Sequence, residues 1–275
     1  ITFQEVNVEG TANLLREAER AGVDRFIYIS SLGADRGTSE YHQSKRAAEA
    51  LVQAFPGGWL IMRPGNVYGP GDGVISTLLQ MVRVLPVVPT VGAGEDPFQP
   101  IYAPDLAAAI IAALEQPAME RQILELAGAE VTTMNGLLEV MAEITGKDPP
   151  RVPLPDMVLE AGAALAGSLG IDLPISHDVL TMLQEENVIG EGRRNALTDV
   201  FGIQPTPLRV GLERLAEELP ERLPSDGVGS LDRHRYWADI RGSRLNADEL
   251  FAVVCREFGQ LAPEQLLRVD PEGRG

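Results

Sequence analysis

The pattern of apolar and polar residues predicts an alternation of helices and strands over the first 146 residues. Apolar positions recur at helical spacing between residues 6 and 21. Residues 26–29 then form a short β-branched and aromatic run, which predicts a buried strand, and residues 59–63 predict another. Similar helical and extended stretches follow, and the last is a predicted helix at 134–145 that Thr132-Thr133 should cap and Gly146 should end. Such alternation is typical of an α/β fold, in which helices cover a parallel sheet.

The pattern changes after residue 150. Four helical stretches follow without strands between them, at residues 156–169, 177–188, 195–201 and 208–219. The next residues are rich in Pro, Gly and Ser, which is typical of a linker. The predicted organisation is therefore a sheet domain at 1–150, a helical cap region at 151–219, a linker at 220–230 and the start of a further domain at 231–275.

Candidate chemistry lies just after the first predicted strand. Ser30 and Ser31 follow that strand, at the end where open α/β sheets bind ligands. Tyr41 and Lys45 are four residues apart on the next predicted helix, for which Thr38 or Ser39 is the expected N-cap. An ammonium beside a phenol lowers the pKa of the phenol, which suits a general acid or base. The same residues also fit an ordinary surface helix, and that alternative stays open.

A Gly- and Pro-rich stretch, residues 64–73, follows the second predicted strand. It lies at the same sheet edge as Ser31 if the two strands are parallel. Ten residues are long for a tight turn and suit a loop shaped around a ligand. By contrast, the Gly92-x-Gly94 pair lacks the third glycine and the following helix of a dinucleotide-binding fingerprint.

Composition and charge exclude several classes of function. The net charge is −17 and the isoelectric point is near 4.6, so a nucleic acid is not an expected partner. One cysteine excludes an internal disulfide, and three scattered histidines do not indicate a metal site. No apolar stretch is long enough to span a bilayer, and the first residues lack the pattern of a signal peptide. We therefore expect a cytoplasmic protein.

Five segments, taken in order, resemble the extended and atypical short-chain dehydrogenase/reductases, the NAD-dependent epimerase/dehydratase family. They are Asn7-Val8-Glu9-Gly10-Thr11, Phe26-Ile27-Tyr28-Ile29-Ser30-Ser31, Tyr41-x-x-Ser44-Lys45, Arg63-Pro64-Gly65-Asn66-Val67-Tyr68-Gly69-Pro70-Gly71-Asp72 and Ile101-Tyr102-Ala103-Pro104-Asp105-Leu106-Ala107. The resemblance covers about residues 1–130. Two later segments, Leu183-x-x-Glu186-Asn187-Val188 and Asn195-Ala196-Leu197-x-x-x-Phe201-Gly202, are similar to the subgroup that includes an accessory subunit of respiratory complex I.

The resemblance implies a Rossmann-type doubly wound sheet and a catalytic set of three residues. Tyr41 would be the acid/base, Lys45 would hold the nicotinamide ribose and lower the pKa of Tyr41, and Ser31 would orient the reacting oxygen. Ser30 is the less favoured serine by its position in the motif. Among the residues that would serve the cofactor and substrate, Pro64, Gly65, Asn66 and Val67 would line the nicotinamide, Asn66 would face the substrate, and Asn7 would support the site.

The resemblance also implies an activity, with one alternative. The expected function is that of an NAD(P)-dependent oxidoreductase or a sugar-type epimerase or dehydratase acting on a small molecule. The alternative is a non-catalytic NAD(P)-binding assembly protein, associated with a membrane surface or a respiratory complex. The sequence does not decide between NAD and NADP.

The sequence departs from the family at its beginning. The family's Gly-x-x-Gly-x-x-Gly turn after a first strand does not occur here. We therefore expect a fragment of a longer protein that holds the C-terminal half of the Rossmann sheet and is inactive alone. The strand at 26–29 would then have one unpaired edge. Residues 231–275 resemble the lead-in to a lipid-binding, helix-grip-type domain.

Overall fold

The computed structural model describes residues 2–86, 88–91, 93–116, 119–154 and 185–219. All of them belong to one compact unit of the chain, Ile1–Ser225. The helix expected at 156–169, the linker at 220–230 and the domain start at 231–275 lie outside the described residues. Most of the helix expected at 177–188 lies outside them as well.

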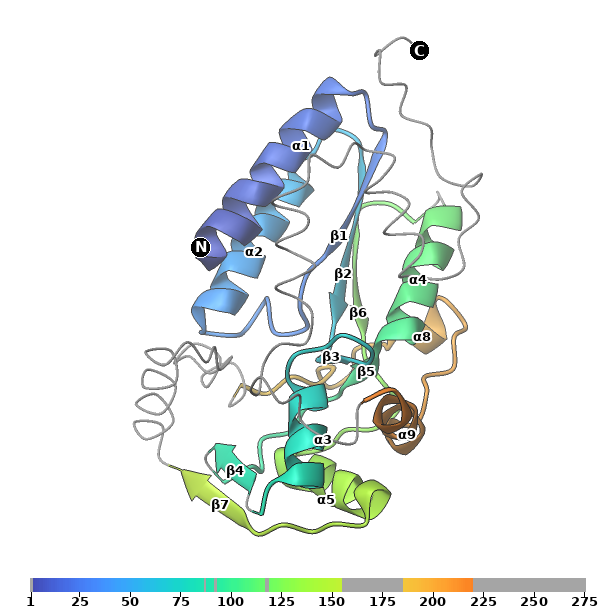
Figure 1. Cartoon of the computed structure of the whole chain (residues 1–275). Coiled ribbons are helices and arrows are strands. Elements are labelled where there is room, and N and C mark those ends of the chain that lie inside the picture. The colour runs from blue at the N-terminus through green and yellow to red at the C-terminus, as the bar shows by residue number, and fades with distance from the viewer. Residues whose placement is uncertain (1, 87, 92, 117–118, 155–184, 220–275) are drawn as a thin grey trace, which may run out of the picture. The chain divides into compact units, whose positions relative to one another are not determined.

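A three-stranded parallel sheet lies at the centre of this unit (Figure 1). Its strands are β1 (Arg25–Ile29), β2 (Gly58–Pro64) and β6 (Gln122–Leu126), in the order β1-β2-β6. Tyr28 pairs with Ile61, and Ile61 pairs with Ile123. Every residue of β2 is buried because strands flank it on both sides, whereas the residues of β1 are half-buried. The predicted α/β class and its parallel sheet are confirmed.

Helices cover both faces of the sheet, as the doubly wound architecture requires. On one face lie α1 (Gly10–Arg20), which a π-helix (Gln4–Glu9) precedes, and α2 (Glu40–Gln53), and on the other lie α4 (Ala103–Glu115) and α8 (Ala196–Asp199) (Figure 1). Strand β2 supplies both interfaces because its side chains alternate in direction. Trp59 and Ile61 pack with the helices α1 and α2, and Leu60 and Met62 pack with α4 and α8.

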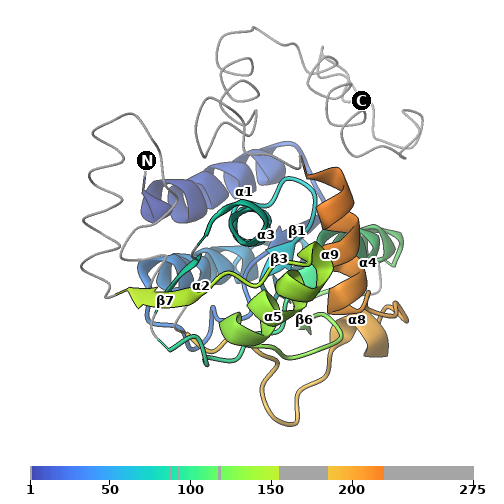
Figure 2. The ribbon, with the colours of Figure 1, turned by 60° about the horizontal axis from the view of Figure 1, so that its bottom comes forward.

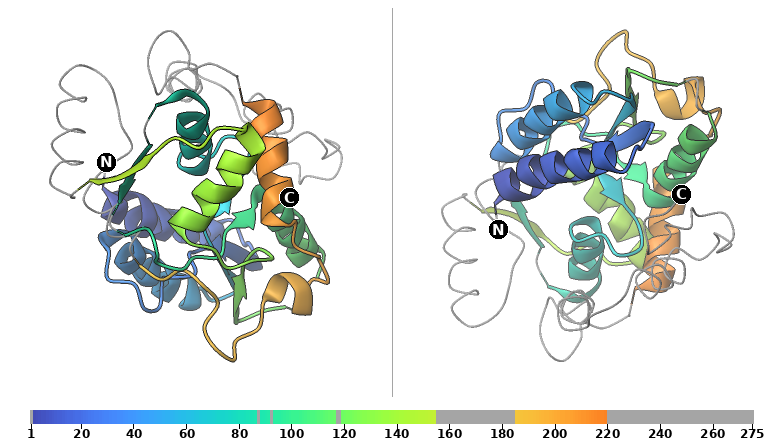
Figure 3. Two further views of the ribbon diagram at one scale, coloured as in Figure 1. Left: turned by 90° about the horizontal axis from the view of Figure 1, so that it is seen from below. Right: turned by 90° about the horizontal axis from the view of Figure 1, so that it is seen from above.

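A further apolar cluster forms beyond the C-terminal edge of the sheet. It is built from α3 (Ile75–Val84), α5 (Met134–Thr145) and α9 (Leu208–Glu218), with Tyr68 and Tyr102. Helix α5 lies against α9 in Figures 2 and 3. Two short parallel pairings join these elements to the loops: β3 (Val67–Tyr68) with β5 (Ile101–Tyr102), and β4 (Val88–Val91) with β7 (Arg151–Leu154).

The local signals for helix ends are confirmed. The Ser39 side chain accepts a hydrogen bond from the His42 backbone and caps α2, and Thr133 caps α5 through the Gly136 backbone. Gly146 ends α5 with a left-handed φ of 67°, which a residue without a Cβ adopts at little cost.

Three local expectations are wrong. The loop at 64–73 contains the short strand β3, and residues 151–154 form β7 where the helical region was expected to begin. Residues 185–188 are not helical. The backbone of Asn187 bonds instead to Pro97 and Gln99, because pairing with a distant segment satisfies its polar groups. Within the described residues, none of the helices has the length and apolar character needed to cross a membrane.

Candidate active site

Ser30 and Ser31 extend β1 at the C-terminal edge of the sheet. The Ser30 backbone donates to the Met62 carbonyl at 2.7 Å, and Leu32 donates to the Pro64 carbonyl at 2.9 Å. Both serine side chains are buried. Their hydroxyls have different partners, because Ser30 donates to the Glu49 carboxylate at 2.5 Å whereas Ser31 lies 3.3 Å from Nε2 of His42.

Tyr41 and Lys45 lie on one face of α2, one turn apart, and both are half-buried. The Lys45 ammonium is 5.8 Å from the centre of the Tyr41 ring and donates to the Ile29 carbonyl at 3.1 Å. Burial raises the pKa of Tyr41, and a side-chain hydrogen bond shared with Ser31 opposes this rise. Burial likewise lowers the pKa of Lys45, against the attraction of Glu49. The expected lowering of the Tyr41 pKa is therefore absent from this structure, since desolvation outweighs the hydrogen bond shared with Ser31.

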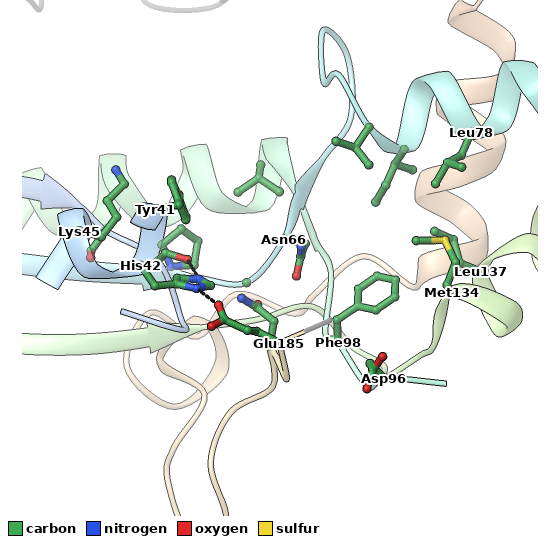
Figure 4. A pocket seen from close by; sticks show the side chains of 18 of the residues that line it. Tyr41, His42, Lys45, Asn66, Leu78, Asp96, Phe98, Met134, Leu137 and Glu185 are labelled. Atoms are coloured by element: carbon green, nitrogen blue, oxygen red, sulfur yellow. Dashed lines mark hydrogen bonds and ion pairs between the residues drawn. The ribbon is translucent and has the colours of Figure 1, made fainter. Parts of the chain in front are cut away.

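These residues line a cavity of about 470 Å³ that has a polar end and an apolar end (Figure 4). Tyr41, His42, Lys45 and Glu185 form the polar end, together with Ser31 beside His42. The apolar end lies on the other side of Asn66 and comes from α3, α5 and the segment before β5. Its labelled apolar side chains are Leu78, Phe98, Met134 and Leu137, and the Asp96 carboxylate lies at its margin beside Phe98.

The loop after β2 lines the middle of the cavity with Pro64, Gly65, Asn66 and Val67. The Gly65 backbone donates to the Leu126 carbonyl at 2.8 Å, and a Cβ on Gly65 would collide with the Gln99 carbonyl. The Asn66 side-chain oxygen is buried and has no hydrogen-bond partner among the described residues. A buried amide oxygen that has no partner and faces a cavity can accept a hydrogen bond from a polar ligand, such as the nicotinamide end of a dinucleotide.

Asn7 does not reach the cavity. Its side-chain amide donates to the Ser44 hydroxyl at 2.9 Å, and Ser44 donates to the Tyr41 carbonyl at 2.7 Å. Asn7 therefore braces the first turn of α2, on which Tyr41 is carried.

A buried ion network holds the edge of the sheet beneath the site. Arg63 donates two hydrogen bonds to Glu49, at 2.8 and 2.6 Å, and pairs with Asp35 at 3.1 Å. Arg193 contacts the carboxylates of Asp35 and Glu125. These pairs connect α2, β2, β6 and the loop after β1. The sequence offered no pattern that would have identified them, since the partners are far apart in the chain.

Two further residues of the polar end, His42 and Glu185, were not predicted from the sequence as site residues. His42 directly follows Tyr41 and is almost completely buried, with 1% of its surface exposed. Its Nδ1 lies 3.0 Å from the Ser39 hydroxyl and pairs with the Glu185 carboxylate (Figure 4). Thr38 and Ser39 donate further hydrogen bonds to Glu185, and although partial burial opposes them they hold its pKa at about 2. In the sequence, the one feature that could have pointed to this pair is the position of His42 directly after Tyr41, the predicted acid/base.

No group of three or more His, Cys, Asp or Glu side chains within the described residues is placed to hold a metal ion.

Residues 1–127 match the model of the NAD-dependent epimerase/dehydratase family. The match covers 127 of the 275 residues. The matched residues include Ser31, Tyr41, Lys45 and the loop at 64–67, so the polar end of the cavity is built largely from the family segment. His42 lies in that segment as well, whereas Glu185 lies outside it.

Two curated relatives show moderate identity to this chain. A mitochondrial NADH dehydrogenase [ubiquinone] 1 alpha subcomplex subunit 9 of Arabidopsis thaliana is 36% identical over 149 residues, which cover 53% of this chain and 37% of the relative. A ceramide reductase of Caulobacter vibrioides is 35% identical over 163 residues, which cover 58% of this chain and 51% of the relative. The chain thus spans about half the length of these relatives or less.

Two solved structures share the fold. MoeE5 in complex with UDP-glucose and NAD aligns over 77% of this chain and 70% of its own, with a TM-score of 0.58 and 22% identity. RMD from Pseudomonas aeruginosa with NADPH aligns over 78% of this chain and 73% of its own, with a TM-score of 0.58 and 18% identity. At such identities the likeness supports the fold.

Proposed function

We propose that this protein is an NAD(P)-dependent oxidoreductase or epimerase that works through Tyr41, Lys45 and Ser31. The observation that carries the proposal is that one cavity collects these three side chains and the partnerless oxygen of Asn66. Lys45 and the loop at 64–67 would hold the nicotinamide end of the cofactor. When bound, the nicotinamide supplies or accepts a hydride.

The residues of this chain would handle the proton. Because burial raises the pKa of Tyr41, its phenol stays protonated near neutral pH and is suited to donate a proton to a substrate carbonyl oxygen. The Lys45 ammonium, 5.8 Å from the ring centre, would then stabilise the phenolate that remains. Ser31, which shares a hydrogen bond with Tyr41, would orient the same oxygen.

The cavity favours an uncharged substrate with an apolar portion. Among the described residues, Lys45 is the one Lys or Arg side chain that lines it, whereas Asp96 and Glu185 bring negative charge. Arg193 is engaged by Asp35 and Glu125, and residues 155–184 contain no Lys or Arg in the sequence. A nucleotide sugar carries a diphosphate, which proteins usually bind with Arg or Lys. The apolar end, by contrast, suits an aliphatic or aromatic group.

Turnover of the full-length protein with NADH and NADPH tests the proposal. Short- and long-chain methyl ketones would serve as candidate substrates, with UDP-glucose as the charged comparison. We expect Tyr41→Phe to lower turnover at least about 100-fold, because it removes the proton donor and leaves the ring in place. The matched control is Gln53→Ala, an exposed change on the same helix. If Tyr41→Phe retained wild-type turnover, the assigned role of Tyr41 would be wrong.

The second candidate is a non-catalytic NAD(P)-binding subunit of a larger assembly. It is favoured by the 36% identity to a protein named as a mitochondrial NADH dehydrogenase subunit. A cofactor that co-purifies with the protein and is neither oxidised nor reduced by the substrates above would support it. Fractionation separates the candidates further, because the enzyme is expected in the cytoplasm and the subunit in a respiratory complex.

A further inference from the structure

The imidazole of His42 is held from both sides in the interior of the site. Its Nδ1 faces the Glu185 carboxylate and the Ser39 hydroxyl, and its Nε2 lies 3.3 Å from Ser31 Oγ. The ring also lies against the loop after β1. A Cβ on Gly33 or on Gly37 would lie less than 3 Å from ring atoms of His42. The ring therefore has one orientation, and Ser31 is its partner toward the cavity.

The hydrogen-bond network assigns the proton of the neutral imidazole to Nδ1. Glu185 is ionised, with a pKa of about 2, so its oxygens can only accept. Nδ1 must then carry the proton that bonds to this carboxylate, which leaves Nε2 with a lone pair. Nε2 can then accept the single proton of Ser31. A Ser31 hydroxyl that donates to Nε2 presents only lone pairs to Tyr41 and to a substrate.

Protonation of the ring reverses this arrangement. An imidazolium donates from both nitrogens, so Nε2 would donate to Ser31 Oγ. The Ser31 proton is then free to be donated to another acceptor in the cavity. No bond to carbon forms or breaks in this exchange. One proton is added at Nε2, and the Ser31 hydroxyl rotates.

We propose that His42, anchored by Glu185, is a positioning residue that sets the direction of the Ser31 hydrogen bond. With His42 neutral, Ser31 accepts from a substrate alcohol. With His42 protonated, Ser31 donates to a substrate carbonyl. The proposal rests on the oxidoreductase function above and adds to it a dependence of carbonyl binding on pH. It also assigns a role to two residues that lie outside the Tyr41–Lys45–Ser31 set.

The charged groups around His42 agree with this role. Glu185 is the one carboxylate in direct contact with the ring among the described residues. Tyr41 packs edge-on at 5.2 Å between ring centres, and Lys45 lies one turn further along α2. The remaining nearby charges on α2 and on the loop after β1 have other partners. Those charges are Asp35, held by Arg63 and Arg193; Arg36, bonded to the Val188 carbonyl; and Arg46, bonded to the Ala34 carbonyl.

A structural role alone makes a different prediction. A histidine that only links the cap of α2 to Glu185 needs its Nδ1 contacts and nothing at Nε2. Its removal would reduce stability without altering how the reaction depends on pH. The two roles therefore separate in any measurement that reports the Nε2 side of the ring.

The first test is ¹⁵N NMR of the histidine side chains in the full-length protein, which reports the protonated nitrogen without any need for turnover. The chain has three histidines, and the signals lost in His42→Gln identify the ring in question. We expect wild-type His42 to carry its proton on Nδ1 in the neutral state. In Glu185→Ala we expect a mixture with the Nε2 form. A wild-type ring protonated on Nε2, or no change in Glu185→Ala, would overturn the proposal.

The second test is the pH profile of kcat/KM for ketone reduction between about pH 5 and pH 8, where imidazoles titrate. We expect the wild-type value to fall as His42 loses its proton, by up to about tenfold per pH unit. In His42→Gln the profile should be flat, while Gln53→Ala, an exposed change near the other end of α2, keeps the wild-type shape. If His42→Gln does not fold, Glu185→Ala keeps the ring and should also flatten the profile. Superimposable profiles would refute the proposal. Absence of turnover in the wild type would refute the proposed function, and NMR of Ser31→Ala then tests the Nε2 side of the ring: the Nε2 resonance of His42 should shift if Ser31 donates to it, and an unchanged resonance would refute the proposal.

Discussion

Replacement of Glu49 by leucine should strongly destabilise the protein, because it leaves the charge of Arg63 buried without its main partner. The side chains of Glu49 and Arg63 are 3% and 9% exposed. They share two hydrogen bonds, at 2.8 and 2.6 Å, and the Ser30 hydroxyl adds a third to Glu49 at 2.5 Å. Breaking one side of a buried ion pair costs about 3–5 kcal/mol.

The size of the loss depends on what remains around Arg63. Asp35 at 3.1 Å still pairs with it, and Glu125 lies at 3.9 Å. These contacts keep the expected cost of Glu49→Leu near the lower limit, at about 3 kcal/mol. Glu49→Gln should cost less, about 1.5–2 kcal/mol, because the amide keeps an oxygen for Ser30 or Arg63 and loses only the charge.

The double variant Glu49→Leu with Arg63→Met separates pairing from burial. An apolar pair of similar volume removes the desolvation cost of both charges, so the double variant should be more stable than the sum of the single effects predicts, by at least about 2 kcal/mol. Asp35 and Glu125 keep Arg193 as their partner in this variant.

Equilibrium unfolding in urea, followed by circular dichroism, measures these differences as changes in midpoint at constant slope. The exposed pair of Arg20 and Glu17, with side chains 81% and 58% exposed, is the matched control. Glu17→Leu should change stability by less than about 0.5 kcal/mol. The reasoning fails if Glu49→Leu costs less than about 1 kcal/mol, or if the single effects simply add.

Three further predictions concern the site and its support. The stabilising effect of the Glu185 carboxylate is present above its ordinary pKa, near 4.5, and is lost as pH falls toward about 2. The difference in unfolding free energy between wild type and Glu185→Gln should therefore shrink between pH 5 and pH 2, and a constant difference would contradict this. Gly33→Ala should destabilise by about 1–3 kcal/mol in urea titrations because the new Cβ meets the His42 ring, whereas Gly10→Ala, whose Cβ meets only the Glu5 carbonyl at 3.6 Å, should not. Leu78→Gln should raise KM for a long-chain ketone roughly tenfold and leave a short ketone unchanged, since it removes apolar surface from one end of the cavity. Equal effects on both ketones would argue against an apolar binding end.

The elements could be predicted from the sequence because their signals are local. The run at residues 59–63 was apolar at every position but Arg63, which fits a strand covered on both faces, and β2 packs in that way. Ser39 and Gly146 marked helix ends through side-chain or backbone chemistry that needs no distant partner. Five ordered motifs then placed these elements in a family, and the match over residues 1–127 confirms it.

The features that could not be predicted from the sequence depend on contacts between distant segments. The predicted helix at 177–188 was wrong for residues 185–188, where the backbone of Asn187 pairs with the segment at 97–99. Glu185 lies 143 residues from His42, and Arg63 lies 14 from Glu49, so no periodicity connects either pair. The prediction that the pKa of Tyr41 is lowered was wrong for a related reason. The spacing to Lys45 was visible in the sequence, but the burial that dominates the pKa was not.

The two adjacent serines show why position in a motif and chemical role need separate arguments. Ser30 donates to Glu49, a carboxylate paired with Arg63, and an arginine keeps its charge at any physiological pH. The proton of Ser30 is therefore committed to one acceptor. Ser31 faces an imidazole, whose lone pair is available in one protonation state and absent in the other. Of the two hydroxyls at this sheet edge, only that of Ser31 has a partner whose hydrogen-bonding role depends on its own protonation state, so the proposed change between donor and acceptor concerns Ser31 and not Ser30.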